Sequence, residues 1–333
     1  MRRKIQRVLV TGGAGFIGSN LIHFVQANRP DWHVVNFDLL TYCGNLENLK
    51  DIDLTRYDFV RGDVCDGKLV EEVLLDHFID GVIHMAAESH VDRSLMDASP
   101  FYKTNVLGTQ SVVDAIRRVQ TKTGRSIPMV HISTDEVYGS LPLEHPKWKF
   151  REDHPLQPNS PYAASKASSD LVVLAAQHTF NLDSMITRCS NNFGPYQFPE
   201  KVIPLFVSNL AQGKKVPLYG DGKNVRDWLH VDDHAEAIIT VLEQGKPGEV
   251  YNIGGNNERS NLQLTYMILL LMGRSLDYIE PVADRLGHDR RYAIDAQKIK
   301  RELGWKPSRS KWPKALENTV QWYLDHKDWW EKL

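Results

Sequence analysis

This chain of 333 residues has few cysteines, nearly balanced positive and negative charges, and no long apolar runs. The three cysteines, Cys43, Cys65 and Cys189, are odd in number and far apart, so they form neither a disulfide framework nor a metal-ligand pattern. We therefore expect reduced thiols, a cytoplasmic protein and no metal site. With 40 Lys and Arg against 42 Asp and Glu, the net charge is −2, which argues against nucleic acid as the main partner.

Membrane and export segments are not expected either. No apolar run is long enough to span a membrane. Arg2, Arg3 and Lys4 resemble the basic start of a signal peptide, but the apolar run over 8–10 is too short for one. Gly/Ser linkers, low-complexity segments and internal repeats are missing as well. The 42% hydrophobic content predicts instead a large core in one or two domains.

A glycine-rich loop follows the first predicted strand, 8–10. It runs from Thr11 to Gly18 and reads TGGAGFIG. Such glycines let the backbone turn tightly and approach a pyrophosphate at the N-terminus of the next helix, predicted over 16–28. A second strand, 34–37, ends at Asp38, where a carboxylate can bond a ribose 2′-hydroxyl. These features together predict a dinucleotide site.

The cofactor is expected to be NAD rather than NADP. Asp38 would repel a 2′-phosphate, and no Arg or Lys occurs over 39–47 to bind one. Strands over 57–61 and 81–84 and helices over 66–76 and 101–120 continue the pattern, with small Ala86 and Ala87 beside the expected cofactor. This alternation predicts an α/β fold with a Rossmann-type, doubly wound parallel sheet.

Polar side chains follow the apolar strand predicted over 129–132. They are Ser133, Thr134, Asp135 and Glu136. Because ligands bind beyond the carboxyl ends of the strands in open α/β sheets, we expect these groups to face a ligand. An N-cap within a polar loop is the alternative for this short stretch.

A Tyr and a Lys open the helix that follows. Ser160 suits the N-cap, and Tyr162 and Lys166 then lie one turn apart on the same face. A free Tyr has a pKa of about 10, and a neighbouring ammonium lowers it, so the pair is suited to taking a proton from a substrate hydroxyl. Tyr219 and Tyr323 have the same spacing to a Lys, but the first lies among glycines and the second on a late helix that we expect to be exposed.

The second half is less regular. A strand over 180–188 is expected to return to the sheet, and prolines then punctuate a smaller lobe of mixed α/β structure. We predict a cofactor domain over 1–190 and a substrate-binding lobe over 191–333, with segments near 225–255 returning to the first domain.

Several motifs together resemble a known family. The glycine loop, Asp38, Tyr162 and Lys166 are similar to those of the extended short-chain dehydrogenases/reductases. The triplet Thr134 to Glu136, the stretch AAESHVDRS over 86–94 and the stretch RCSNNFGP over 188–195 resemble the nucleotide-sugar 4,6-dehydratases of that superfamily. The resemblance covers nearly the whole chain; one departure is Phe193, where Tyr is expected.

The resemblance implies two sets of ligand contacts. The residues expected to bind NAD are Gly12, Gly15, Phe16, Ile17, Gly18, Asp38, Leu39, Thr41, Asp63, Val64, Ala86, Ala87, Ser89, Thr104, Tyr162, Lys166 and Asn191. The residues expected to bind the nucleotide sugar are Ser89, Thr134, Asn191, Lys201, Tyr219, Arg226, Asn261, Arg285 and His288. Each of the cationic residues, considered alone, is more typical of a solvated surface position, and the resemblance is what favours a role in binding.

The implied reaction removes water from a hexose diphosphonucleotide, with dTDP-glucose expected before UDP-glucose. Tyr162 takes the C4 hydroxyl proton, Lys166 stabilises the phenolate, and Thr134 holds the C4 oxygen. Glu136 then removes the C5 proton, and protonated Asp135 donates to the departing C6 hydroxyl. The product is a 4-keto-6-deoxy sugar.

Two alternatives remain open on the sequence. An epimerase or decarboxylase of the same superfamily would use the same Tyr and Lys without needing the two acids. A catalytically silent NAD-binding regulator would bind NAD without turnover. The family also implies a homodimer formed through the helices over 101–120 and 162–180.

Overall fold

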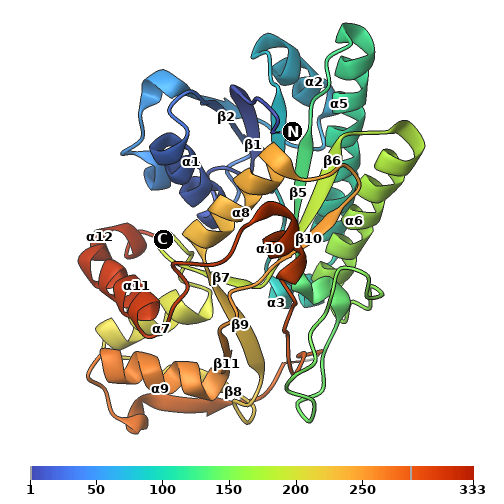
Figure 1. The fold of residues 1–333 in the computed structure, drawn as a ribbon. Helices are drawn as coiled ribbons and strands as arrows, with labels where there is room; N and C mark the ends of the chain where they lie inside the picture. The colour runs from blue at the N-terminus through green and yellow to red at the C-terminus, as the bar shows by residue number, and fades with distance from the viewer. Residues whose placement is uncertain (1, 286) are drawn as a thin grey trace.

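The computed structural model describes residues 2–285 and 287–333 and has a seven-stranded parallel sheet at its centre (Figure 1). Met1, which begins the predicted cofactor domain, and Leu286, within the predicted substrate-contacting stretch, lie outside the described residues. The strand order is β10-β6-β5-β4-β1-β2-β3. The chain therefore winds outward in both directions from β1, which confirms the predicted doubly wound α/β fold.

The strands of this sheet are mostly buried. Their bounds are β1 Arg7–Thr11, β2 His33–Asp38, β3 Tyr57–Arg61, β4 Gly81–His84, β5 Met129–Thr134, β6 Ser184–Cys189 and β10 Val250–Ile253. Every residue of β4, β5 and β6 is buried, as expected for a parallel sheet that is covered on both faces.

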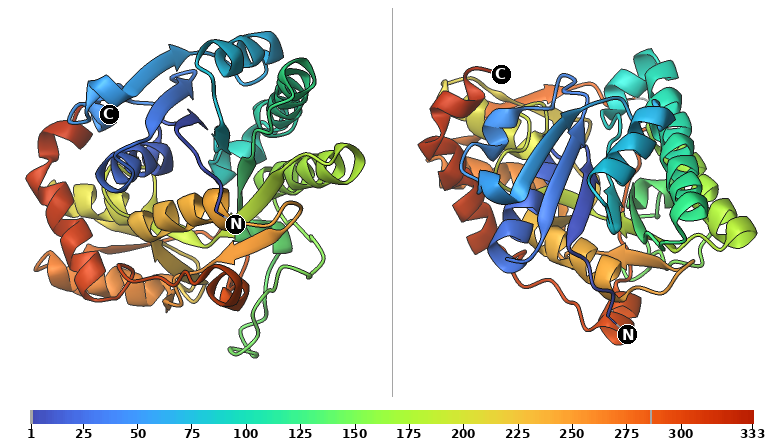
Figure 2. Two further views of the ribbon diagram at one scale, coloured as in Figure 1. Left: turned by 45° about the horizontal axis from the view of Figure 1, so that its top comes forward. Right: turned by 90° about the horizontal axis from the view of Figure 1, so that it is seen from above.

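Helices cover both faces of the sheet. On one face α1 (Phe16–Asn28) packs against α8 (Val231–Gln244). On the other, α2 (Gly67–Asp76) packs against α5 (Thr109–Thr123), and α5 packs against α6 (Pro161–Phe180). The views in Figure 2 show α5 and α6, in teal and yellow-green, side by side at one side of the molecule.

Two predicted elements of the first half differ from the structure. The helix expected over 101–120 consists of α4 (Ser99–Phe101), a π-helical segment over Tyr102–Gly108 and then α5. The strand expected over 180–188 begins four residues later, because α6 continues to Phe180 and ends at Asn181, a left-handed residue with φ 52°. Asn accepts this conformation readily, which makes it a suitable helix C-terminus.

The smaller lobe lies beyond the carboxyl ends of the strands, because β7 begins two residues after β6 ends. Its strands are β7 Asn191–Phe193, β8 Val216–Tyr219, β9 Val225–His230, β11 Glu258–Ser260 and β12 Ile279–Val282. Its helices are α7 Val202–Ala211, α9 Asn261–Leu271, α11 Lys314–Asp325 and α12 Lys327–Trp330. Two further helices border the lobes: α3 Val91–Met96 and α10 Gln297–Leu303.

The lobe has a core of its own, built by α7, α9 and α11 with the aromatic residues near the C-terminus. Tyr323 belongs to this core. It is 1% exposed and donates a hydrogen bond to the Gln197 carbonyl at 2.8 Å, so the expectation that its helix side is exposed was wrong. The later segments α8 and β10 lie with the large sheet, while the division of the chain near residue 190 remains a prediction.

Two further observations concern the described part of the chain. None of its helices combines the length and apolar character needed to cross a membrane. Cys43, Cys65 and Cys189 are free thiols.

Candidate active site

A cavity of about 350 Å³ lies between the carboxyl ends of the strands and the smaller lobe. The glycine loop, the ends of β2, β4 and β5 and the start of α6 form one side, and residues 189–192 and 196–201 contribute the other. Every residue predicted to bind NAD lines this cavity, as do Thr134, Asp135 and Glu136. The topology of the sheet therefore brings together groups as far apart in the chain as Gly12 and Lys201.

The glycine loop is shaped for a close backbone approach. Gly12 has φ +75°, and a Cβ there would lie 2.8 Å from the backbone nitrogen of Ala86. A Cβ on Gly18 would lie 2.2 Å from the Gly12 carbonyl oxygen, so this glycine lets α1 approach the loop. The resulting cradle, open at the start of α1, fits a pyrophosphate.

Asp38 is held at the end of β2. Its carboxylate accepts hydrogen bonds from the backbone N–H groups of Ala14 at 2.9 Å and Leu40 at 2.8 Å. Burial raises the pKa of Asp38, while these two N–H groups oppose that shift. The carboxylate thus fixes the glycine loop from the cavity wall, and its contact with a ribose remains a prediction.

The two adjacent carboxyl groups begin a short 3-10 helix, Asp135–Tyr138, directly after β5. Thr134 caps this helix, because its hydroxyl accepts from the Glu136 N–H at 3.3 Å, and it lies 3.4 Å from Asp135 Oδ1. Asp135 is 2% exposed. The capping alternative considered for this stretch is therefore also true, but it leaves both carboxyl groups on the cavity wall.

Burial holds both carboxyl groups toward their protonated forms. It raises the pKa of Asp135 well above its ordinary value, and the neighbouring Glu136 raises it further. Burial also raises the pKa of Glu136, but Arg226 and then Arg285 oppose that shift. The surroundings therefore favour the protonated form more strongly for Asp135 than for Glu136. This difference suits Asp135 as an acid and Glu136 as a base.

Tyr162 and Lys166 lie at the start of α6. The Ser160 hydroxyl caps the helix by accepting from the Ala163 N–H at 3.1 Å, as predicted. Lys166 donates from Nζ to the Ile132 carbonyl at 2.7 Å, and burial lowers its pKa to about 8. Burial and then the Glu136 carboxylate raise the pKa of Tyr162, and the expected lowering by the ammonium is not among the causes that act on it.

Two buried histidines lie near enough to Lys166 for its charge to lower their pKa, and sequence reasoning missed both. His84 and His131 face each other in the register of β4 and β5, with ring centroids 5.4 Å apart. His84 lies between the hydroxyls of Thr11 at 2.8 Å and Thr109 at 3.0 Å, and burial lowers its pKa to about 3. Because the two imidazole rings are neutral, they do not repel the Lys166 ammonium. The alternation of side chains along the strands is the sequence signal that could have placed both histidines inside the sheet.

The predicted substrate-binding residues fall into two groups. Ser89, Thr134, Asn191 and Lys201 line the cavity. The others, which do not line it, come from β8, β9, the start of α9 and the segment after β12: Tyr219, Arg226, Asn261, Arg285 and His288.

Arg226 links the second group to the carboxyl pair. It is 6% exposed and donates to the carbonyls of Val225 at 2.8 Å and Asp289 at 2.9 Å. Its guanidinium lies over the Tyr292 ring, 4.2 Å from the ring centre. The charge of Arg226 opposes the pKa shift of Glu136, so a buried cation lies near the carboxyl pair.

Several buried polar atoms around the site have no hydrogen-bond partner among the described residues. They are Ser133 Oγ, Asp135 Oδ2, Ser190 Oγ, Asn191 Oδ1 and Arg285 Nε. Buried polar atoms are normally paired, so this cluster fits a polar ligand. No group of three His, Cys, Asp or Glu residues suited to a metal ion occurs within residues 2–285 and 287–333.

Comparison with known proteins gives consistent matches. The family model for GDP-mannose 4,6-dehydratase matches residues 9–312. A dTDP-glucose 4,6-dehydratase of Streptomyces antibioticus is 51% identical over 331 residues, covering 98% of this chain and 95% of the relative. A dTDP-glucose 4,6-dehydratase of Escherichia coli K12 is 46% identical over 343 residues, covering 97% and 94%.

Solved structures agree in fold. The crystal structure of a dTDP-glucose 4,6-dehydratase from Streptomyces venezuelae, with NAD and TYD bound, is 49% identical with a TM-score of 0.92 over 98% of this chain and 99% of that one. A UDP-glucose 4-epimerase from Thermotoga maritima, with UDP-glucose, is 28% identical with a TM-score of 0.84 over 96% and 99%. The shared fold thus serves more than one sugar-nucleotide reaction.

Proposed function

The chain belongs to the nucleotide-sugar 4,6-dehydratase family, and we infer that it is the NAD-dependent enzyme that converts dTDP-glucose to dTDP-4-keto-6-deoxy-glucose and water. The family model takes its description from GDP-mannose 4,6-dehydratase. The relatives at 46–51% identity, however, are named as dTDP-glucose 4,6-dehydratases. The observation that carries the proposal is the pair of buried acids at the end of β5, on the wall of the cavity that also contains Tyr162 and Lys166. Bound NAD supplies a hydride acceptor for C4 and a hydride donor for C6.

We propose that Tyr162, Lys166 and Thr134 act on the C4 hydroxyl. Tyr162 accepts its proton as a phenolate and becomes a phenol, Thr134 holds its oxygen, and Lys166 stabilises the phenolate that must exist before this transfer. Because burial raises the pKa of Tyr162, the phenolate needs a cation close by. The Lys166 ammonium, now bonded to the Ile132 carbonyl, is the cation that α6 supplies one turn away.

Asp135 and Glu136 act on the neighbouring carbons. The ketone formed at C4 acidifies the C5 proton, which Glu136 removes as a base. Asp135, kept protonated by burial, gives its proton to the departing C6 hydroxyl. An epimerase needs no such acid–base pair, and this difference favours the dehydratase over the epimerase that shares the fold.

Arg226 and Arg285 are proposed to bind the diphosphate. Arg226 is fixed in place by two backbone carbonyls, and Arg285 Nε lacks a partner among the described residues. Planar guanidinium groups bind phosphate oxygens through paired hydrogen bonds. His288, 6.4 Å from the Tyr219 ring centre, joins them at the same surface.

A mass-spectrometric screen of the purified protein with dTDP-glucose, UDP-glucose and GDP-mannose tests the substrate and the reaction. We expect loss of water from dTDP-glucose, and near-complete loss of turnover in Tyr162→Phe with NAD and substrate still bound. A product of unchanged mass would identify an epimerase. Bound NAD without turnover of any sugar nucleotide would identify a regulator.

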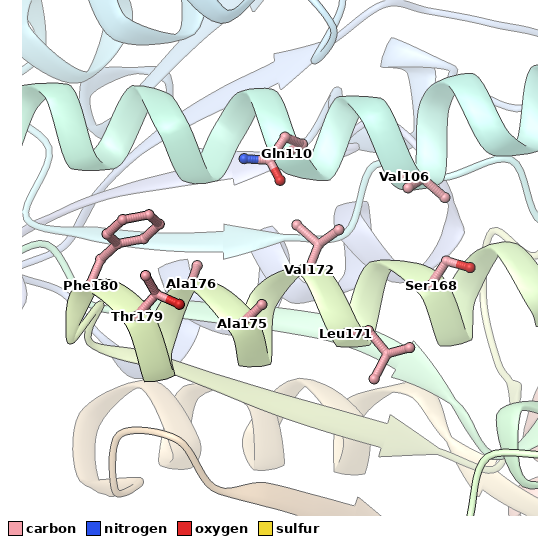
Figure 3. A pocket seen from close by; sticks show the side chains of 9 residues that line it. All are labelled: Val106, Gln110, Ser168, Leu171, Val172, Ala175, Ala176, Thr179 and Phe180. Atoms are coloured by element: carbon pink, nitrogen blue, oxygen red, sulfur yellow. The ribbon is translucent and has the colours of Figure 1, made fainter.

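We also propose that the protein is a homodimer formed through α5 and α6. These helices leave a pocket of about 440 Å³, and Figure 3 shows Val106 and Gln110 of one wall facing Val172 and Ala176 of α6. Leu171 and Phe180 are 58% and 50% exposed on the same helix. Exposed apolar groups of this kind support an isologous contact. Light scattering of the native protein should give twice the mass of one chain. The Leu171→Glu variant should give the mass of a single chain.

We propose a cytoplasmic location, which the free thiols of Cys43, Cys65 and Cys189 support. Reduced, unpaired cysteines are usual in that compartment. Fractionation of cells that produce the native chain tests the proposal, and recovery with the membranes or the medium would contradict it.

A further inference from the structure

A cluster of side chains crosses the rim of the cofactor cavity from one lobe to the other. Tyr42, in the segment after β2, donates a hydrogen bond from its hydroxyl to Glu200 Oε1 at 3.0 Å. Its ring also meets Phe198 edge to face, with ring centroids 5.7 Å apart. The two partners are 158 residues apart in the chain, so the contact joins separate parts of the molecule.

Glu200 is held on its other side as well. Its second oxygen lies 3.5 Å from His90 Nε2, and its first lies 3.7 Å from Lys201 Nζ. His90 Nδ1 accepts from the Arg93 N–H at 3.4 Å, so the neutral ring carries its hydrogen on Nε2, facing Glu200. The Arg93 guanidinium lies over the Tyr42 ring, 4.0 Å from the ring centre, and packs against it.

These contacts lie beside the cofactor cavity. Leu39, Thr41, Cys43 and Gly44, which flank Tyr42 in the chain, line the cavity, and so do residues 196–198, 200 and 201. The segment over 39–45 has neither helix nor strand structure. It is therefore held at the rim mainly by turns and side-chain contacts. The contacts that reach the smaller lobe are those of Tyr42 with Glu200 and Phe198 and that of the Cys43 thiol with Glu200.

We propose that Tyr42 and Glu200 form a clasp that retains NAD in its groove throughout the catalytic cycle. The inference rests on the proposed function, since a hydride taken from C4 can return to C6 only if the reduced cofactor stays bound. Release requires the 39–45 segment to move away from residues 196–201, which breaks the Tyr42–Glu200 hydrogen bond and the Tyr42–Phe198 contact. The clasp therefore slows dissociation without touching the reacting atoms.

The dissociation rate of NADH in the absence of any sugar tests the proposal. Protein loaded with NADH is mixed with excess NAD, and the loss of energy transfer from tryptophan to bound NADH is followed. Tyr42→Phe, which keeps the ring, and Glu200→Ala should each release NADH roughly fivefold faster. The double variant should release it no faster than Glu200→Ala, because both changes remove one interaction.

Matched controls are Tyr266→Phe on α9, where the tyrosine is 44% exposed, and the exposed Glu280→Ala on β12. Both should release NADH at the native rate, and all variants should keep the native melting temperature. A native rate in folded Tyr42→Phe, or strictly additive effects in the double variant, would overturn the clasp. Because no sugar is present, fast release in the variants would support it even if dTDP-glucose proved not to be the substrate.

Discussion

Two carboxyl groups that are adjacent in the chain are assigned opposite roles, and their surroundings explain why. Asp135 is buried beside another carboxyl, which favours its protonated form. Glu136 is buried too, but Arg226 and Arg285 favour its charged form. The assignment of acid and base therefore depends on residues of the smaller lobe that lie about 90 and 150 positions downstream.

Replacing Asp135 by Asn should separate the steps of the reaction. The amide is a far weaker proton donor, so water loss should slow roughly 10²- to 10⁴-fold. The first oxidation should survive, and absorbance of enzyme-bound NADH should therefore rise after dTDP-glucose is added. Asp153→Asn, at a side chain that is 70% exposed, is the control. If oxidation is lost as well, Asp135 is a positioning carboxylate rather than the acid.

The pH dependence of kcat/KM should report Glu136. As a base it must be deprotonated, so kcat/KM should fall as the pH drops through its pKa, which burial places above the ordinary value of about 4.3. Arg226 opposes that shift, so Arg226→Gln should raise this pKa and move the acid limb to higher pH, while weakening substrate binding by roughly 2–5 kcal/mol.

The control for this experiment is Arg151→Gln, at a guanidinium that is 62% exposed. This variant should leave both the pH profile of kcat/KM and the affinity for the substrate unchanged. An acid limb that stays in place in folded Arg226→Gln, together with native substrate affinity, would show that Arg226 faces neither Glu136 nor the diphosphate.

Among the elements, those marked by local signals could be predicted from the sequence. The helix over 16–28 lies between a glycine loop and Pro30, and the strands over 57–61 and 81–84 are short apolar runs beside polar ones; all three have the predicted bounds. The start of β6 was misplaced because the apolar sequence continues from α6, and the helix ends instead at the left-handed Asn181. The π-helical segment from Tyr102 to Gly108 has no local signal that we recognise.

Long-range contacts around the site could not be predicted in this way. The motifs identified the residues that line the cavity, because the carboxyl ends of parallel strands meet at one edge. Tyr42 and Glu200, by contrast, meet only because the smaller lobe folds back over the groove. Arg226 could be named from a motif, but its distance from Glu136 follows from how β9 docks.

The helix α6, which carries Tyr162 and Lys166, is tied to the sheet by a buried ion pair. Arg188 on β6 donates from Nε to Asp170 Oδ2 at 2.8 Å, and their side chains are 3% and 0% exposed. Arg188 also donates to the Tyr138 hydroxyl at 2.9 Å. The pair therefore joins α6, β6 and the 3-10 helix that begins with Asp135 and Glu136.

Asp170→Ala should destabilise the fold by about 3–5 kcal/mol, because it leaves a buried guanidinium without its partner. Denaturant unfolding measures the change. Glu317→Ala, which breaks an exposed pair with Lys314, should cost within about 0.5 kcal/mol. A loss of less than about 1 kcal/mol in Asp170→Ala would mean that water or another group compensates Arg188.

At the scale of the whole molecule, the two lobes divide the proposed work between them. The large sheet supplies the cofactor groove, the carboxyl pair and the Tyr162–Lys166 helix, and the smaller lobe supplies the basic surface for the diphosphate. The clasp at the rim connects them. This arrangement suits a cofactor that takes part in the first step and the last step of one turnover without leaving.

The path of the C4 hydrogen tests this account most directly. The native enzyme is given dTDP-glucose with deuterium at C4 and no added NAD, and the product is analysed by mass spectrometry and NMR. We predict deuterium at C6 of the same sugar molecule, a solvent proton at C5 and no accumulation of free NADH. A C6 hydrogen derived from solvent, or stoichiometric release of NADH, would contradict the account.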